Sequence, residues 1–111
     1  MTRQKEDLLK GTLDLLILKT LDLEPMHGWG IGERIKVFSG NTLTVPTGSL
    51  YPALQRLLRK GLIAAEWRTT DTNRRARYYK LTRAGRKQLR EEQQSWARAS
   101  LAVNQVLEAS L

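Results

Sequence analysis

Residues 47–81 read TGSLYPALQRLLRKGLIAAEWRTTDTNRRARYYKL, and two hydrophobic periods follow each other within this segment. Its first part predicts a helix, because leucines recur every three or four residues up to Gly61, which suits a helix terminus. From Leu62 the pattern alternates with a period of two, breaks at the polar residues 69–73, and resumes from Arg75. The change of period predicts a β-hairpin with a basic tip directly after the helix. The core stripe of that helix consists of Leu50, Leu54, Leu57 and Leu58.

The leucine-dense segment 8–23 predicts a first helix, which ends before Pro25 because proline disfavours helix in the residue before it. Its apolar residues fall on two opposite faces of the helix. A helix that is apolar on two sides is buried on two sides, and in so small a protein a second subunit is the most economical cover. One face holds Leu9, Leu13, Leu16 and Ile17, and the opposite face, expected in a dimer interface, holds Leu8, Leu15 and Leu18.

The glycine-rich stretch 27–32 leads into a predicted second helix, with Ile31, Ile35 and Phe38 at helical spacing. The glycines do not match a nucleotide-binding loop, because no strand precedes them and the G-x-G-x-x-G spacing breaks at Glu33. We interpret them as small residues that permit close packing of helices.

A long last helix is expected over residues 83–110, with Thr82 as its cap. Its apolar residues recur at the spacing of a coiled-coil heptad, which indicates a dimerisation surface. The residues of this seam are Leu89, Trp96, Ala99, Val103 and Val106.

Charge is concentrated in one part of this 111-residue chain, whose formal net charge is +8. Residues 67–90 hold nine basic residues and one acidic residue, Asp71, so the whole surplus lies there. Such a block indicates a polyanionic partner, nucleic acid first and a membrane surface second, with a solvated face as the alternative. The chain contains no cysteine and one histidine, so thiol catalysis, cysteine-ligated zinc and acid–base enzymology have little support, and no cofactor is expected.

The order helix, helix, helix, hairpin, helix predicts an α+β, mostly helical fold: a winged helix-turn-helix with a two-stranded β wing and a long C-terminal dimerisation helix. We expect residues 1–81 to form the DNA-binding domain and residues 82–111 the dimerisation helix. The third helix would enter the major groove of double-stranded DNA, while the basic wing tracks phosphates or the neighbouring minor groove.

Particular side chains suit particular DNA contacts in this arrangement. Hydroxyl groups at the start of the third helix can donate to phosphates, whereas Gln55 suits adenine and Arg56 suits guanine. Thr47 or Ser49 also suits the N-cap of that helix. The predicted DNA-binding residues are Thr47, Ser49, Tyr51, Gln55, Arg56, Asn73, Arg74, Arg75 and Arg77.

Three other sites on the chain have a structural interpretation. Trp67 on the hairpin is expected in the core, with contact to DNA as the alternative. Tyr78 and Tyr79 face opposite ways on a strand, so at most one of them is in the core and the other is free to reach phosphate. His27 is expected to be structural, since a lone histidine cannot build a metal site without cysteines or clustered carboxylates.

Several short motifs lie between roughly residues 8 and 90: Leu9 with Gly11-Thr12-Leu13, the corner 26–28, the stretch 48–54, Arg56-Leu57, residues 61–63, and the stretch 77–85 with its Arg-Tyr-Tyr and Leu-Thr pairs. Together they resemble the PadR family of bacterial transcriptional regulators, with 48–54 matching the recognition helix. The strings 11–18 and 74–77 resemble an acidobacterial subgroup, and the single short C-terminal helix resembles the compact branch of the family.

The resemblance implies a homodimeric winged-helix repressor, located in the bacterial cytoplasm and on the nucleoid when bound, with no membrane partner. The last helix would pair with the first helix of the other subunit, and the operator would be a palindrome. Trp96 is then either a packed seam residue or part of a dimer-interface pocket for a small, flat aromatic effector. The alternative function is a winged-helix protein-interaction module without base-specific DNA readout.

Overall fold

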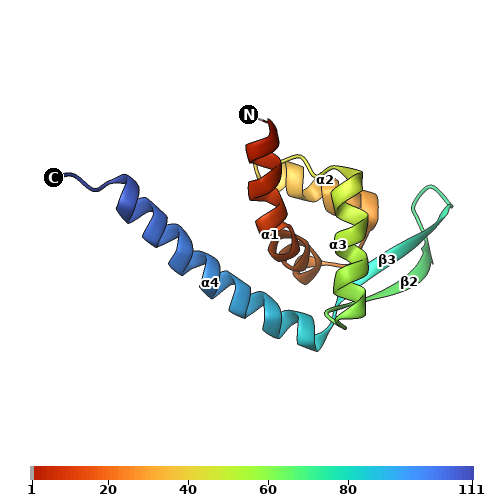
Figure 1. The fold of residues 1–111 in the computed structure, drawn as a ribbon. Helices are drawn as coiled ribbons and strands as arrows, with labels where there is room; N and C mark the ends of the chain where they lie inside the picture. The colour runs from red at the N-terminus through yellow and green to blue at the C-terminus, as the bar shows by residue number, and fades with distance from the viewer. Residues whose placement is uncertain (1) are drawn as a thin grey trace.

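The computed structural model describes residues 2–111, with side chains described from Thr12 onward. Its elements follow the order α1 (Thr2–Leu23), β1 (Met26–His27), α2 (Gly28–Phe38), α3 (Thr47–Arg59), β2 (Ile63–Thr69), β3 (Arg75–Leu81) and α4 (Arg83–Leu107) (Figure 1). The winged-helix order expected from the sequence is confirmed.

The sheet has three antiparallel strands in the order β1-β3-β2, one more than the expected two-stranded wing. The hairpin pairs Ile63 with Leu81 and Thr69 with Arg75 at its two ends. The additional strand, β1, pairs only Met26 with Tyr79 and His27 with Tyr78. Two residues are too few to show a period of two in the sequence. This short strand ties the start of α2 to the root of the wing.

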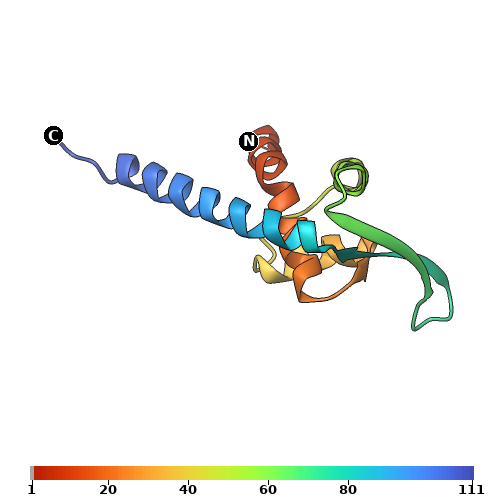
Figure 2. The same cartoon turned by 90° about the horizontal axis from the view of Figure 1, so that it is seen from below.

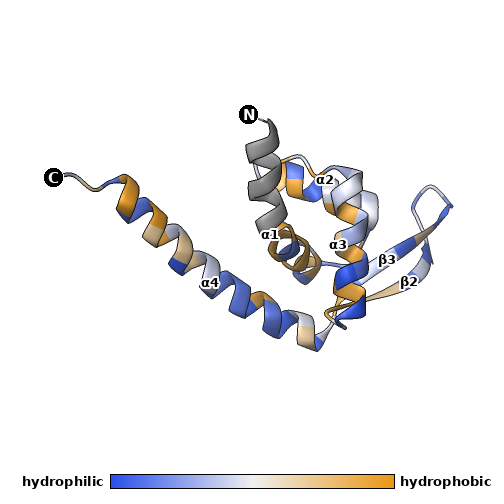
Figure 3. Ribbon diagram, viewed as in Figure 1, coloured by the Kyte–Doolittle hydropathy of each residue, from blue (hydrophilic) through white to orange (hydrophobic). Residues whose placement is uncertain are grey.

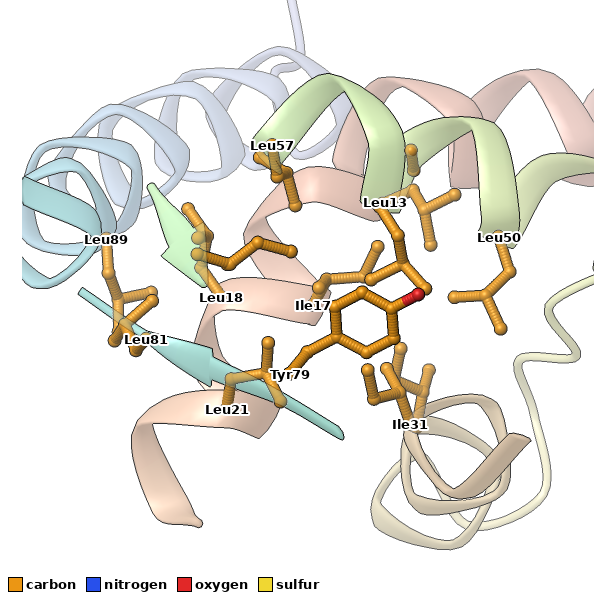
Figure 4. Packing of buried hydrophobic residues seen from close by; sticks show 14 residues of the cluster. Leu13, Ile17, Leu18, Leu21, Ile31, Leu50, Leu57, Tyr79, Leu81 and Leu89 are labelled. Atoms are coloured by element: carbon orange, nitrogen blue, oxygen red, sulfur yellow. The ribbon is translucent and has the colours of Figure 1, made fainter. Parts of the chain in front are cut away.

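The hydrophobic core is built around α1, which contacts α2, α3, α4 and β3. In Figure 4 the ring of Tyr79 points from β3 into this cluster. The buried apolar residues are Leu13, Ile17, Leu18, Leu21, Ile31, Ile35, Leu50, Ala53, Leu54, Leu57, Ile63, Tyr79, Leu81 and Leu89.

The packing around α1 changes part of the expected dimer interface. Leu18 and Leu89 are 1 % and 4 % exposed within the single chain, so both are core residues of the protomer and neither is accessible to a partner. The reason is that α1 is covered on more than one side by its own chain. Leu15 is half-buried against the core, and the side chain of Leu8 lies outside the described residues.

The N-termini of α3 and α4 are capped differently. Thr82 caps α4 as expected: its hydroxyl accepts a hydrogen bond from the N–H of Gly85 at 3.0 Å and donates to the carbonyl of Gly61 at 2.7 Å. For α3 the expectation is wrong, since Pro46 occupies the N-cap position and the helix begins at Thr47, one residue after it. The fixed φ of proline suits this position, and the helix needs no hydroxyl cap there.

The wing and α4 leave the helical body in opposite directions, as both Figure 1 and Figure 2 show. The molecule is consequently elongated, with extents of 61 × 30 × 21 Å. The helix α3 lies between these two projections and beside the root of the wing (Figure 1).

Candidate nucleic-acid interface

The helix α3 presents one face to solvent and packs the other on the core. Its buried residues, Leu50, Ala53, Leu54 and Leu57, lie on the inner side. The outer side carries Gly48, Tyr51, Pro52, Gln55 and Arg59, all exposed. Gln55 lies on this outer face, one helical turn after Tyr51. Arg59 follows Gln55 by four residues, one helical turn, and therefore lies on the same face. This spacing could have identified Arg59 as a residue of the outer face from the sequence alone.

Arg56 lies on the flank of α3 that faces α1. Its Nη2 atom donates to Oδ1 of Asp14 at 2.8 Å, and both side chains are partly buried. The expected base-reading residue is therefore engaged within the protein and does not share the outer face with Gln55 and Arg59.

Tyr51 lies directly against the first residue of α2. A Cβ atom added to Gly28 would come within 2.8 Å of the Tyr51 ring and 2.9 Å of its hydroxyl oxygen, so only glycine permits this contact. The Tyr51 hydroxyl consequently lies near the N-terminal end of α2, where the helix dipole favours negative charge. His27 is the N-cap of α2, and its Nδ1 atom accepts a hydrogen bond from the N–H of Gly30 at 3.0 Å, a structural role as expected.

A groove of about 620 Å³ separates the start of α2 and Tyr51 from the wing. Aromatic rings and three arginines line it, with Asp71 as the one acid, which suits a ligand that has both apolar and anionic parts. Three of the predicted wing residues are brought together here. The lining side chains include His27, Trp29, Tyr51, Arg74, Arg75, Arg77 and Tyr78. Thr47 and Ser49 lie at the start of α3, outside this lining.

The wing tip is a tight turn that Asn73 makes possible. Asn73 has a positive φ of 62°, a conformation that asparagine adopts more readily than most residues. The Asn73 N–H donates to the carbonyl of Thr70 at 2.9 Å, and the Arg74 N–H donates to the Thr70 hydroxyl at 3.2 Å. Asn73 thus shapes the loop that presents Arg74.

The two adjacent tyrosines of β3 have opposite environments. Tyr79 is buried in the core, and this burial raises the pKa of its phenol above the ordinary value. Tyr78 is half-buried on the other face. The centre of its ring lies 5.3 Å from the centre of the His27 ring and 5.3 Å from the guanidinium carbon of Arg68. Tyr78 is therefore the residue of the pair that faces outward.

Trp67 is not in the core, contrary to expectation. It is 61 % exposed, because the outer half of β2 extends beyond the helical body and has nothing to pack against. The guanidinium of Arg75 lies 5.7 Å from its ring centre.

Acidic groups offset little of the positive charge of the wing. Glu66 forms an ion pair with Arg68, and that hydrogen bond lowers the pKa of the Glu66 carboxyl. Asp71 is an exposed acid at the tip and lines the groove together with the arginines. Arg74, Arg75 and Arg77 remain as a positive cluster beside the groove.

The second half of α4 carries exposed apolar residues, and Figure 3 shows the apolar colour returning toward the C-terminal end of this helix. Trp96, Ala99, Val103 and Val106 are all exposed. Leu107, one turn after Val103, is exposed as well and was not identified from the heptad pattern.

Two other kinds of site find no support in the described part of the chain. None of its helices combines the length and apolar character needed to cross a bilayer. Within the same residues, His, Asp and Glu side chains do not gather into a group of three that could hold a metal ion.

Known proteins resemble the chain over nearly its whole length. It is 26 % identical over 104 residues to an uncharacterised protein of Lysinibacillus sphaericus, covering 94 % of this chain and 95 % of that one. A solved PadR-like transcriptional regulator of Bacillus cereus superposes with a TM-score of 0.81 at 30 % identity, covering 94 % of this chain and 99 % of that one. A PadR family regulator of Eggerthella lenta gives 0.81 at 28 % identity, with 98 % and 93 % covered.

Residues 17–91 match the model of the transcriptional regulator PadR-like family, and this range contains α3, the groove and the entire wing. Members of this family are transcriptional regulators that bind DNA, so the enzyme interpretation is excluded. The groove beside α3 agrees with that activity. The chain belongs to the PadR-like family of transcriptional regulators.

Proposed function

We propose that the protein is a homodimeric repressor that binds a palindromic operator, with α3 in the major groove and the wing along the flanking backbone. The observation that carries this proposal is the position of the groove: it lies between Tyr51 on α3 and the arginines of the wing. A DNA strand that follows the groove would bring the outer face of α3 to the adjacent base pairs.

Base readout is assigned to Gln55 and Arg59. Both are exposed on the outer face of α3, and an α-helix fits the width of the major groove. The amide of Gln55 can make two hydrogen bonds to adenine, and the guanidinium of Arg59 can make two to guanine. Arg59 replaces Arg56 in this role, because Arg56 already pairs with Asp14.

Phosphate contacts are assigned to groups on both sides of the groove. Tyr51 donates from one side, together with the hydroxyls of Thr47 and Ser49 at the start of α3. Arg74, Arg75 and Arg77 neutralise phosphates from the other side. These contacts fix the position of the protein on the duplex and carry no sequence information themselves.

The second half of α4 is assigned to the dimer. Its apolar stripe begins at Leu89, which packs on the core of the same chain, and continues through Trp96, Val103 and Leu107, which do not. A second copy would cover this exposed part of the stripe. In this division residues 1–81 bind DNA and residues 82–111 join the protomers. A two-fold dimer presents its recognition helices about 34 Å apart, one turn of the duplex, so the operator is a palindrome.

Regulation by a small molecule is assigned to Trp96. Two copies of this half-exposed ring would lie near the two-fold axis, where they could hold a flat aromatic effector between them. Binding there would alter the spacing of the two recognition helices and release the operator.

Salt-dependent binding to duplex DNA tests the proposal. The slope of log K against log salt should decrease by about 0.9 for each phosphate that is no longer neutralised, so Arg74→Ala and Arg77→Ala should each flatten it. Arg98→Ala, which removes an exposed charge from α4, is the matched control and should leave the slope unchanged. A wild-type protein that binds an acidic protein but not duplex DNA would instead support the protein-interaction module.

A further inference from the structure

Trp67 is an exposed indole in the middle of the basic wing, and neither α3 nor the groove accounts for it. Residues that pair across an antiparallel hairpin share a face of the sheet. Trp67 pairs with Arg77, and Thr69 pairs with Arg75, so the indole and both guanidinium groups lie on one face of the wing.

The Trp67 indole and the Arg75 guanidinium are in contact with each other. The guanidinium carbon lies 5.7 Å from the ring centre, within the range of a cation–π contact, and the two side chains border a shallow hollow of about 220 Å³. Arg75 also lines the large groove, so it connects the hollow with the surface assigned to the DNA backbone.

We propose that Trp67 and Arg75 form a second DNA-contact element, in which the indole packs on the deoxyribose of the backbone strand that Arg75 and Arg77 neutralise. This inference rests on the proposed function. Deoxyribose is the apolar part of the backbone, and it alternates with the phosphates along each strand. An apolar ring that contacts Arg75 and pairs across the hairpin with Arg77 therefore matches a strand on which sugars and phosphates alternate.

The charge pattern favours this occupant over a protein partner. The wing has two acids: Glu66 lies on the other face and is paired with Arg68, and Asp71 lies at the tip, where the three arginines that line the groove with it outnumber it. An exposed tryptophan beside these arginines would make its most favourable contacts with a polyanion that also has apolar segments.

The test compares Trp67→Ala with Phe38→Ala, which removes an aromatic ring of the same exposed fraction, 61 %, at the far end of α2. Trp67→Ala should weaken binding to duplexes of selected and of random sequence alike, by about tenfold, because a sugar contact carries no base information. Its salt slope should equal that of the wild type, since no charge is removed, and Trp67→Phe should recover part of the loss. Phe38→Ala should bind as the wild type does.

Fluorescence gives an independent measurement, because the chain has three tryptophans and Trp29→Phe/Trp96→Phe leaves Trp67 as the single indole. Saturating random-sequence duplex should protect Trp67 from acrylamide quenching.

Three results would overturn the inference while leaving the proposed function intact: unchanged affinity of Trp67→Ala, a salt slope of Trp67→Ala lowered as expected for Arg77→Ala, or a greater loss on single-stranded DNA than on duplex. The second would mean that the indole only positions Arg75, and the third that it stacks on unpaired bases. Failure of the wild type itself to bind duplex would count against the proposed function instead.

Discussion

The carboxylate of Asp14 on α1 holds the guanidinium of Arg56 on α3 at 2.8 Å. These residues are 42 positions apart, and their pairing ties the recognition helix to the helix at the centre of the core. It also turns a cation of α3 away from the surface that would face DNA. The Asp14–Arg56 pair therefore links α1 to α3, while Gln55 and Arg59 on the outer face of α3 stay exposed.

We expect the Asp14–Arg56 pair to contribute little to the free energy of unfolding and nothing to base preference. The side chains are 33 % and 42 % exposed, so Asp14→Asn should lower stability by about 0.5 kcal/mol, measured by urea denaturation. The same variant releases Arg56 without removing it. If Arg56 were a reading residue, its release would change the preferred DNA sequence, and that result would contradict the assignment.

Base readout by the outer face of α3 predicts a loss that depends on the DNA sequence. Gln55→Ala and Arg59→Ala should each lower affinity for the selected site by about 1–3 kcal/mol and for random duplex by much less. Arg56→Ala is the control and should affect both duplexes to the same small extent. Equal losses of Gln55→Ala on the two duplexes, measured by fluorescence anisotropy, would show that another element reads the bases.

Part of this site could be predicted from the sequence, and part depends on contacts that are distant along the chain. The helix, the hairpin and the basic cluster all follow from short-range periodicity and charge. The pairing of Arg56 with Asp14 could not be predicted, because the two residues lie 42 positions apart. A helical wheel of α3 would have favoured Arg59, which is one turn from Gln55.

Trp67 shows a second limit of the sequence pattern. The alternation along residues 62–67 correctly indicated which side chains share a face of the hairpin. The alternation could not indicate where along its length the hairpin extends beyond the helical body. Tyr79 and Trp67 share a face of the hairpin, but Tyr79 lies against the helical body and is buried, whereas Trp67 lies beyond it and is exposed. The strand β1 was missed because it consists of only two residues.

Gly48 offers a test that separates DNA binding from stability. It lies in the first turn of α3 on the outer face, and a Cβ atom built on it meets no described atom within 4 Å. Gly48→Ala should therefore raise helix stability by about 0.5 kcal/mol. It should also weaken DNA binding, because the added methyl group would lie between the start of α3 and the wall of the DNA major groove.

Gly85 provides the contrast for that experiment. A Cβ atom on Gly85 would overlap the backbone carbonyl of Leu62, so Gly85→Ala should lower the melting temperature strongly. A Gly48→Ala protein that melts higher and binds DNA as tightly as the wild type would place the DNA farther from the start of α3 than proposed.

The dimer assignment predicts that a charge in the exposed stripe of α4 yields monomers. Val103→Asp would place a carboxylate in an apolar interface without a partner, which is far less favourable than its exposure in the monomer. Sedimentation at micromolar concentration should show the change, and Arg98→Ala on the same helix should remain dimeric. Trp96→Ala should keep the dimer and lose binding of flat aromatic compounds; a monomeric Trp96→Ala would make this ring a packing residue.

Selection of bound sequences from a pool of random duplex DNA tests the central claim most directly. The wild-type protein should enrich a palindrome whose half-sites are centred about one helical turn apart, roughly 10 base pairs. Gln55→Ala should enrich a palindrome of the same spacing with relaxed preference at one position in each half-site. Enrichment of a single, non-repeated site, or of no sequence at all despite salt-dependent binding, would contradict a two-fold dimer that reads DNA with the outer face of α3.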